Sequence, residues 1–249
     1  MIDSHCHLQD SRFISERDFF FTQSLQHFEK IHICATQKSD WQATLAIKNQ
    51  YPEKIDLSLG IHPWFVDAQS PLDLNLLEEL ISENTHIHIG ECGYDKFKAI
   101  TNQNKDLQIE ILEKHFILAQ KYNRSISLHS VNADDIILPL LKKYPVRTLI
   151  HSFWGSPQQA LAYQDFGAYL SFSASIFKKS PEKRDVFFKS IHPQLVLIES
   201  DSPDQHPHSH KEKPVINTPM TCLEIYTELE KYAISEQQIA QNYHNWLNT

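Results

Sequence analysis

Short apolar segments alternate with longer amphipathic stretches along the chain. Eight segments rich in β-branched residues and bounded by polar stretches predict buried strands at 2–8, 30–36, 55–63, 86–95, 125–131, 146–155, 168–175 and 195–203. Helical periodicity marks stretches between them, such as 72–83 and 107–122, and two more at roughly 220–232 and 235–247. Strands and helices that alternate eight times predict an α/β fold, a (β/α)8 barrel of the TIM type.

The chain length agrees with one such barrel. A chain of 249 residues is close to what a single (β/α)8 barrel needs, and no repeat, low-complexity tract or linker divides it. We therefore expect one domain over residues 1–249. Glycine occurs only five times, so we expect each glycine at a position that requires it.

Titratable residues fall late in several predicted strands. In each case the apolar run comes first and the polar group follows, and barrel enzymes build their sites at the C-terminal ends of strands. The residues that follow this rule are His5, His7, Glu91, His129, His151 and Asp201. We expect them to meet at one mouth of the barrel.

Four imidazoles and two carboxylates exceed the ligand set of one tetrahedral ion, so we expect two divalent ions per chain. One ion is assigned to Asp201 and the two histidines of the first strand, which point the same way because strand side chains alternate. The other ion is assigned to His129 and His151, and Glu91 bridges both. Two such ions can activate a shared water for hydrolysis.

Each of these histidines has a simpler interpretation. A single buried histidine is often a core residue that is hydrogen-bonded to the backbone, and two histidines two residues apart recur by chance in a chain with 15 of them. The joint pattern favours metal, because six coincidences at one rim would otherwise need explaining. A buried glutamate or aspartate without a cation would also be costly.

Several motifs carry a resemblance to a known family. They are IDSHCHL (2–8), GIHP (60–63), GECGYD (90–95), LHS (128–130), HSFWGS (151–156), SFSASIFKK (171–179), IESDSP (198–203) and NTP (217–219). Together they make the chain resemble the TatD-type metal-dependent hydrolases, or TatD DNases, of the amidohydrolase superfamily. The resemblance implies a TIM-type barrel and metal ligands at the same six positions.

Two acidic residues have a second possible role. Asp201 is either a ligand only or also the general base that takes a proton from the attacking water, and we treat Asp201 and Glu91 as the catalytic pair. Asp95 resembles the acid of the family's G-x-x-G-x-D stretch. It either holds a histidine ligand in place or caps a turn or helix.

Other residues are candidates for substrate contact. His62 follows the third strand and either touches substrate or makes a structural hydrogen bond. Trp154 either offers a face for a nucleobase or packs against its neighbours. Lys178 and Lys179 either contact phosphate or begin a solvated helix.

The surroundings of the site depart from the family pattern. Val131 stands where the family commonly has the arginine of HSR, so a guanidinium suited to phosphate is missing. Ser152 and Trp154 replace the usual Cys and Ser, and Lys96 stands where an aromatic residue is common. The sequence therefore specifies metal-dependent hydrolysis more firmly than it specifies DNA.

Net charge and cysteine content narrow the expected partners and cellular compartment of the protein. The formal charge of −8 speaks against a broad basic surface for long duplex nucleic acid. Four cysteines without C-x-x-C spacing favour a reduced, cytoplasmic protein. We expect neither a signal peptide nor a membrane span, and we expect a monomer.

Three functions fit this pattern. The leading hypothesis is a deoxyribonuclease or phosphodiesterase acting on single-stranded or frayed DNA ends, because a concave mouth admits a strand end more readily than a duplex. The second is a hydrolase of another ester or amide, such as a lactone or an acylated amine. The third is a non-catalytic metal-binding subunit of a larger complex. The ligand types suit zinc or manganese, and the resemblance adds magnesium.

Overall fold

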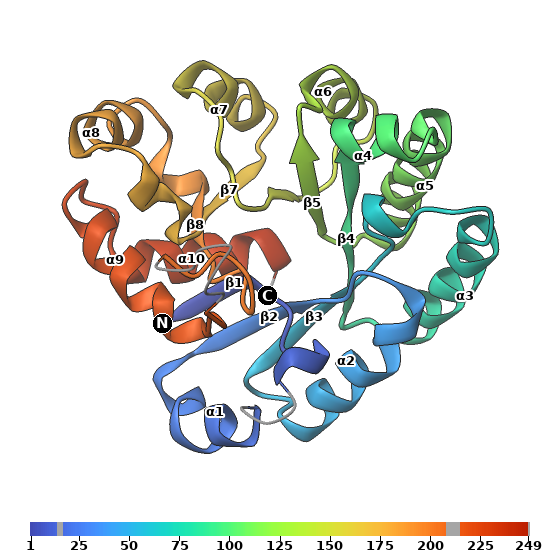
Figure 1. Cartoon of the computed structure of the whole chain (residues 1–249), viewed down its shortest axis with the longest axis horizontal. Helices are drawn as coiled ribbons and strands as arrows, with labels where there is room; N and C mark the ends of the chain where they lie inside the picture. Colours follow the sequence, from blue (N-terminus) through green and yellow to red (C-terminus); the bar gives the residue numbers. More distant parts are fainter. Residues whose placement is uncertain (14–16, 208–214, 249) are drawn as a thin grey trace.

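The computed structural model describes residues 1–13, 17–207 and 215–248, and Figure 1 shows strands at the centre with helices around them. Eight parallel strands pair in chain order, from β1 to β8, and form a nearly closed barrel. The strands are β1 (Ile2–Cys6), β2 (Lys30–Cys34), β3 (Ile55–Leu59), β4 (Ile87–Asp95), β5 (Ile126–Val131), β6 (Thr148–Ile150), β7 (Tyr169–Phe172) and β8 (Val196–Ile198). The predicted (β/α)8 barrel is confirmed.

Helices fill the connections between the strands, and two more, α9 and α10, follow the last strand. They are α1 (Arg17–Gln23), α2 (Lys38–Gln50), α3 (Ser70–Glu83), α4 (Lys96–Thr101), α5 (Lys105–Tyr122), α6 (Asp134–Lys143), α7 (Pro157–Gln164), α8 (Pro181–Phe188), α9 (Cys222–Glu230) and α10 (Glu236–Leu247). The four helical stretches expected from periodicity correspond to α3, α5, α9 and α10, within two residues at each end. The longest helix, α5, buries Ile111, Leu112, Phe116 and Ala119, which share one face.

The barrel closes between its last and first strands through individual hydrogen bonds. Ser4 Oγ donates to the carbonyl of Ile198 over 2.7 Å. The His7 amide donates to the Ser202 carbonyl over 2.7 Å, and the Asp201 amide donates to the His5 carbonyl over 3.1 Å. The closure therefore places the two histidines of the β1 end beside Asp201.

The opposite end of the barrel is covered by α10. The carbonyl of Trp246 accepts from Ser125 Oγ over 2.5 Å, just before β5, and from Arg147 Nε over 3.1 Å, just before β6. Asn242 Nδ2 donates to the Val196 carbonyl at the start of β8 over 2.7 Å. The C-terminal helix thus closes the base of the barrel and leaves the other end open.

Six strands end earlier than expected, β1, β2 and β7 by two or three residues and β3, β6 and β8 by four or five. We predicted strands to residues 63, 155 and 203, whereas β3 ends at Leu59, β6 at Ile150 and β8 at Ile198. Ser152 and Asp201 have positive φ angles of 45° and 52°, which takes the chain out of the extended conformation. His62, His151 and Asp201 consequently lie in loops just beyond their strands.

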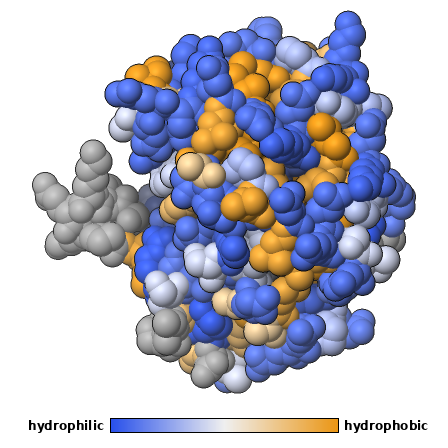
Figure 2. Space-filling model, turned by 90° about the vertical axis from the view of Figure 1, so that its right-hand side faces the viewer, coloured by the Kyte–Doolittle hydropathy of each residue, from blue (hydrophilic) through white to orange (hydrophobic). Residues whose placement is uncertain are grey.

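The side of the molecule that carries α3, α4 and α5 has a mainly polar surface (Figure 2). In Figure 2, hydrophobic areas interrupt this hydrophilic surface. The exposed apolar residues of these helices include Leu72, Phe97, Ile100 and Ile117. Within the described residues, none of the helices has the length and hydropathy of a membrane span.

Candidate metal centre

Glu91 lies at the centre of a cluster of imidazoles at the open end of the barrel. Its Oε2 is 3.3 Å from Nε2 of His5 and 3.5 Å from Nε2 of His7. Its Oε1 is 3.3 Å from Nδ1 of His129 and 3.0 Å from Nε2 of His151. The two carboxylate oxygens therefore face two different pairs of histidines.

Two further residues complete the cluster. Asp201 Oδ1 lies 3.3 Å from His7 Nε2 and 3.9 Å from His5 Nε2, on the Oε2 side of Glu91. His62 Nε2 lies 3.1 Å from Glu91 Oε1, on the other side. The structure thus brings together all six residues that strand position selected, and it adds His62, for which the sequence predicted either a substrate contact or a structural hydrogen bond.

Two glycines allow β4 to carry Glu91 into this position. A Cβ at Gly90 would lie 2.5 Å from the Ser127 carbonyl oxygen, and a Cβ at Gly93 would lie 2.0 Å from the His129 carbonyl oxygen. Both residues also have positive φ angles, 126° and 149°, which favour glycine. Any larger residue would push β4 away from β5 and separate Glu91 from His129.

Each histidine ligand candidate is oriented through its other ring nitrogen. His7 Nδ1 lies 2.8 Å from the Cys34 carbonyl oxygen, and His5 Nδ1 lies 3.1 Å from Ser127 Oγ. His129 Nε2 lies 3.3 Å from Asp95 Oδ2. Partners of this kind fix the ring orientation of metal-binding histidines.

Asp95 makes both of the contacts that the sequence left open. Besides meeting His129, it caps α4, because its Oδ1 accepts from the Lys98 amide over 3.0 Å. Its Oδ2 also accepts from Nε1 of Trp64 over 2.8 Å. Asp95 therefore links a histidine of the cluster to a helix and to an indole ring.

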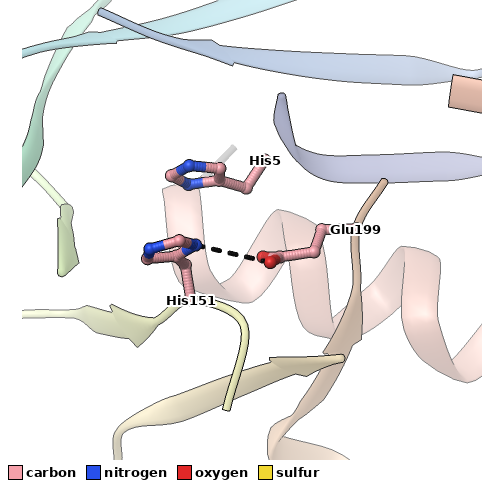
Figure 3. Close-up of side chains that lie close together, drawn as sticks. All are labelled: His5, His151 and Glu199. Carbon is pink, nitrogen blue, oxygen red and sulfur yellow. Dashed lines mark hydrogen bonds and ion pairs between the residues drawn. The ribbon is translucent and has the colours of Figure 1, made fainter. Parts of the chain in front are cut away.

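Glu199 is a residue of this site that the sequence reasoning missed. Its Oε1 lies 3.4 Å from Nδ1 of His151 (Figure 3). Ser171 Oγ donates to its Oε2. The rings of His5 and His151 stack at 4.1 Å with an angle of 11° between their planes. Glu199 is fully buried, and the signal that could have found it is an acidic residue directly after the apolar strand β8.

The charges of the cluster stabilise one another. Burial raises the pKa of Glu91, but the surrounding imidazoles, His62 and His151 foremost, outweigh it and hold that pKa well below its usual range. Burial lowers the pKa of His7, but the hydrogen bond with Asp201 and the charge of Glu91 outweigh it and raise the pKa to about 9. For His62 burial dominates and lowers the pKa to about 4. The carboxylate at the centre is therefore ionised.

The donor set fits divalent metal. Nε2 of His5 is fully buried and makes no hydrogen bond, although it faces Glu91 and Asp201. A buried nitrogen without a partner is costly, and a cation between these groups would satisfy it. Imidazole nitrogens and carboxylate oxygens suit zinc and manganese.

A cavity of about 760 Å³ opens over the cluster. His7, His62, Glu91, His129, His151 and Asp201 all line it. Trp154 and Lys178 are not among the described residues that line it. Trp154 is half exposed and packs under Lys179, whose Nζ lies 4.3 Å from its ring centroid, and Lys178 is exposed at the end of a 3-10 helix.

Gln205 is a second residue that the sequence did not single out. It lines the cavity, and its Nε2 donates to Asp201 Oδ2 and, over 2.8 Å, to Ser152 Oγ. Asp201 therefore presents one oxygen to the histidines and the other to Gln205. Val131, the residue in place of the family's arginine, lines the same cavity.

A cluster of imidazoles and carboxylates at the open end of a (β/α)8 barrel is typical of metal-dependent hydrolases. The chain belongs to the family described as TatD related DNase, whose model matches residues 2–248, so the resemblance is confirmed. It is a metal-dependent hydrolase of the TatD family.

Individual relatives agree in sequence and fold. The chain is 26% identical over 238 residues to "Uncharacterized metal-dependent hydrolase YjjV" of Escherichia coli, an alignment that covers 92% of this chain and 88% of that protein. The crystal structure of the YjjV TatD homolog superposes with a TM-score of 0.85 at 24% identity and covers 100% and 98% of the two chains. A TatD family hydrolase from Entamoeba histolytica superposes with a TM-score of 0.81 at 18% identity and covers 99% and 97%.

Proposed function

We propose that the protein is a two-metal phosphodiesterase that hydrolyses DNA at single-stranded or frayed ends. The observation that carries the proposal is the orientation of Glu91, whose two oxygens face two separate pairs of histidines. A carboxylate in that orientation can bridge two cations. The family description, TatD related DNase, supports a phosphodiester as the bond that is broken.

In this proposal His5, His7 and Asp201 would hold one ion, and His129 and His151 would hold the other, with Glu91 available to both. His62 borders the same oxygen of Glu91 as His129 and His151 do. When bound, the two ions would acidify water and polarise the phosphoryl oxygens. The imidazoles are kept in place by contacts of their other ring nitrogens with Cys34, Ser127, Asp95 and Glu199.

Asp201 is the proposed general base. Burial raises its pKa, but the hydrogen bond with His7 and the charges of nearby histidines outweigh it and lower the pKa below the ordinary value, so the carboxylate is ionised. Gln205 donates a hydrogen bond to Oδ2 of Asp201, and Oδ1 of Asp201 faces the histidines. Asp201 can thus receive a proton from water attacking a phosphodiester in the cavity.

The test begins with protein stripped of metal by a chelator and reloaded with zinc, manganese or magnesium. Each preparation is offered a labelled single-stranded DNA oligonucleotide, bis-p-nitrophenyl phosphate and a panel of lactones. We expect metal-dependent cleavage of both phosphodiesters. Glu91→Gln should abolish it, whereas His192→Asn, at an exposed position outside the cavity, should not.

Two outcomes would overturn the proposal. Turnover of lactones without turnover of either phosphodiester would assign the site to other esters. Tight metal binding without hydrolysis of any substrate would favour a metal-binding subunit.

A further inference from the structure

We infer that Trp64, with Phe65, forms a base-binding subsite beside the metal centre, so that the substrate presents one phosphodiester and one neighbouring base to the cavity. The inference rests on the proposed phosphodiesterase function and specifies its substrate. It replaces Trp154, which the sequence suggested for stacking, by an aromatic residue that the structure places in the cavity wall.

Both aromatic residues line the cavity and are partly exposed. They belong to the 3-10 helix Pro63–Phe65, directly after His62, and Trp64 and Phe65 are 49% and 42% exposed. The indole of Trp64 lies 5.2 Å from the ring of His62 and 6.2 Å from the ring of His129, centroid to centroid. An open aromatic surface therefore borders the metal centre directly.

The indole is held in a fixed position. Its Nε1 donates to Asp95 Oδ2 over 2.8 Å, and the same oxygen lies 3.3 Å from His129. The His62 ring accepts from the Trp64 amide over 3.1 Å, and Lys98 Nζ lies over the indole, 4.7 Å from its centroid. A fixed ring can stack with a base at little entropic cost, and every base offers a π-face.

The charge of the cavity wall limits how many phosphates of a substrate the cavity can bind. Outside the metal centre, three of the described lining residues are carboxylates: Asp10, Asp40 and Asp204. The permanently charged cation among the described lining residues is Arg12. Its guanidinium donates to Asp10 over 3.0 and 2.8 Å and to Asp204 over 2.9 and 2.8 Å. Its guanidinium is thus engaged by two acids of the protein itself.

Proteins that follow a nucleic-acid backbone use grooves lined by cations as well as aromatic rings. This wall has the aromatic residues, but its described part has three acids and one cation, Arg12, which is already paired with two of them, where successive phosphates would need free cations. Binding must then come from one phosphate at the metal centre and one base at Trp64. The substrate class that fits is a terminal nucleotide of a strand or a small nucleotide ester.

The experiment compares two esters that share a leaving group, thymidine 5′-(p-nitrophenyl phosphate) and ethyl p-nitrophenyl phosphate. Stacking predicts that kcat/KM of wild type favours the thymidine ester by about tenfold or more. Trp64→Ala should reduce that preference to about twofold. Trp64→Phe, which keeps a ring but loses the bond to Asp95, should retain most of it.

Trp154→Ala is the matched control, because Trp154 is 47% exposed but does not line the cavity. It should keep the wild-type preference. Calorimetric binding of thymidine 5′-monophosphate to the metal-loaded protein gives a readout apart from turnover, and Trp64→Ala should weaken it about tenfold. For a single-stranded 12-mer, log kcat/KM against log salt should have a slope near −0.7, the value for one phosphate.

The possible results distinguish an error in the proposed phosphodiesterase function from an error in the base-binding subsite. If neither ester is hydrolysed, the phosphodiesterase function itself is wrong. If both esters are hydrolysed equally well, or if Trp64→Ala leaves the preference and nucleotide binding intact, the function stands and the base subsite is wrong. A salt slope of about −3 or steeper would show several phosphate contacts and would also overturn the inference.

Discussion

Replacing Glu199 tests whether a residue beyond the six predicted ligands controls metal binding; with His5 and His151 it forms one of the groups that could hold an ion. Glu199 is fully buried, and its Oε1 lies 3.4 Å from Nδ1 of His151. That distance is longer than the usual 2.7–3.2 Å of such hydrogen bonds, so the contact acts mainly by charge and orientation. Loss of such a partner typically weakens metal binding by about 10- to 100-fold.

Glu199→Gln keeps the shape of the side chain and removes its charge, so we expect the lower end of that range. A tenfold loss corresponds to about 1.4 kcal/mol of binding free energy. Glu199→Ala also removes the acceptor for Ser171 Oγ, so it should approach a loss of about 100-fold. A loss of affinity in Glu199→Gln, which keeps the shape of the buried side chain, separates the effect on His151 from a general packing defect.

The assay is a competition titration of the apoprotein with metal and a fluorescent chelator. Glu228→Gln provides the control, because Glu228 is also a buried glutamate with a cationic partner, Arg184, at 2.6 Å. It should lower thermal stability and leave metal affinity unchanged. Wild-type metal affinity in Glu199→Gln, with the protein folded by circular dichroism, would refute the role of Glu199.

Three further predictions follow from the same structure. Metal at about 100 times its dissociation constant should raise Tm by about 5–10 °C in a thermal melt, and no shift would contradict a site in the folded protein. His115 is buried, which lowers its pKa from 6.5 to about 4, so its contribution to stability is full above 6.5 and is lost as pH falls toward 4. Urea unfolding of His115→Gln should therefore lose about 2 kcal/mol less than wild type between pH 7.5 and pH 5, and equal losses would refute this. Gln205→Ala should reduce kcat about tenfold with little change in KM, because Asp201 loses its second contact, whereas a change confined to KM would indicate a substrate contact instead.

The sequence was sufficient for the barrel and for the six residues that meet at its mouth, because both depend on strand order and on position within a strand. Glu91, His129 and Asp201 follow apolar runs in three different strands, and parallel strands in a barrel end at one rim. Chain order alone therefore predicts that they converge.

The residues that the sequence missed depend on side-chain direction and loop geometry. Glu199 follows its strand as Asp201 does, yet only the packed structure shows that it turns inward to His151 and Ser171. Gln205 reaches Asp201 because both have positive φ angles, 56° and 52°, in a loop whose conformation no periodicity encodes. For Trp154 the sequence left stacking and packing open, and the structure shows packing against Lys179.

The scarcity of glycine connects the fold to the site. Of the five glycines in the chain, three stand where strands β3, β4 and β5 approach one another around Glu91. A Cβ at Gly60 would lie 2.7 Å from the Glu91 carbonyl oxygen, and Gly90 and Gly93 meet the β5 backbone as closely. Glycine weakens strands, so its concentration here is not explained by the stability of the barrel. It is explained by a carboxylate that must reach histidines on both of its sides, which is the geometry that the two-metal proposal requires.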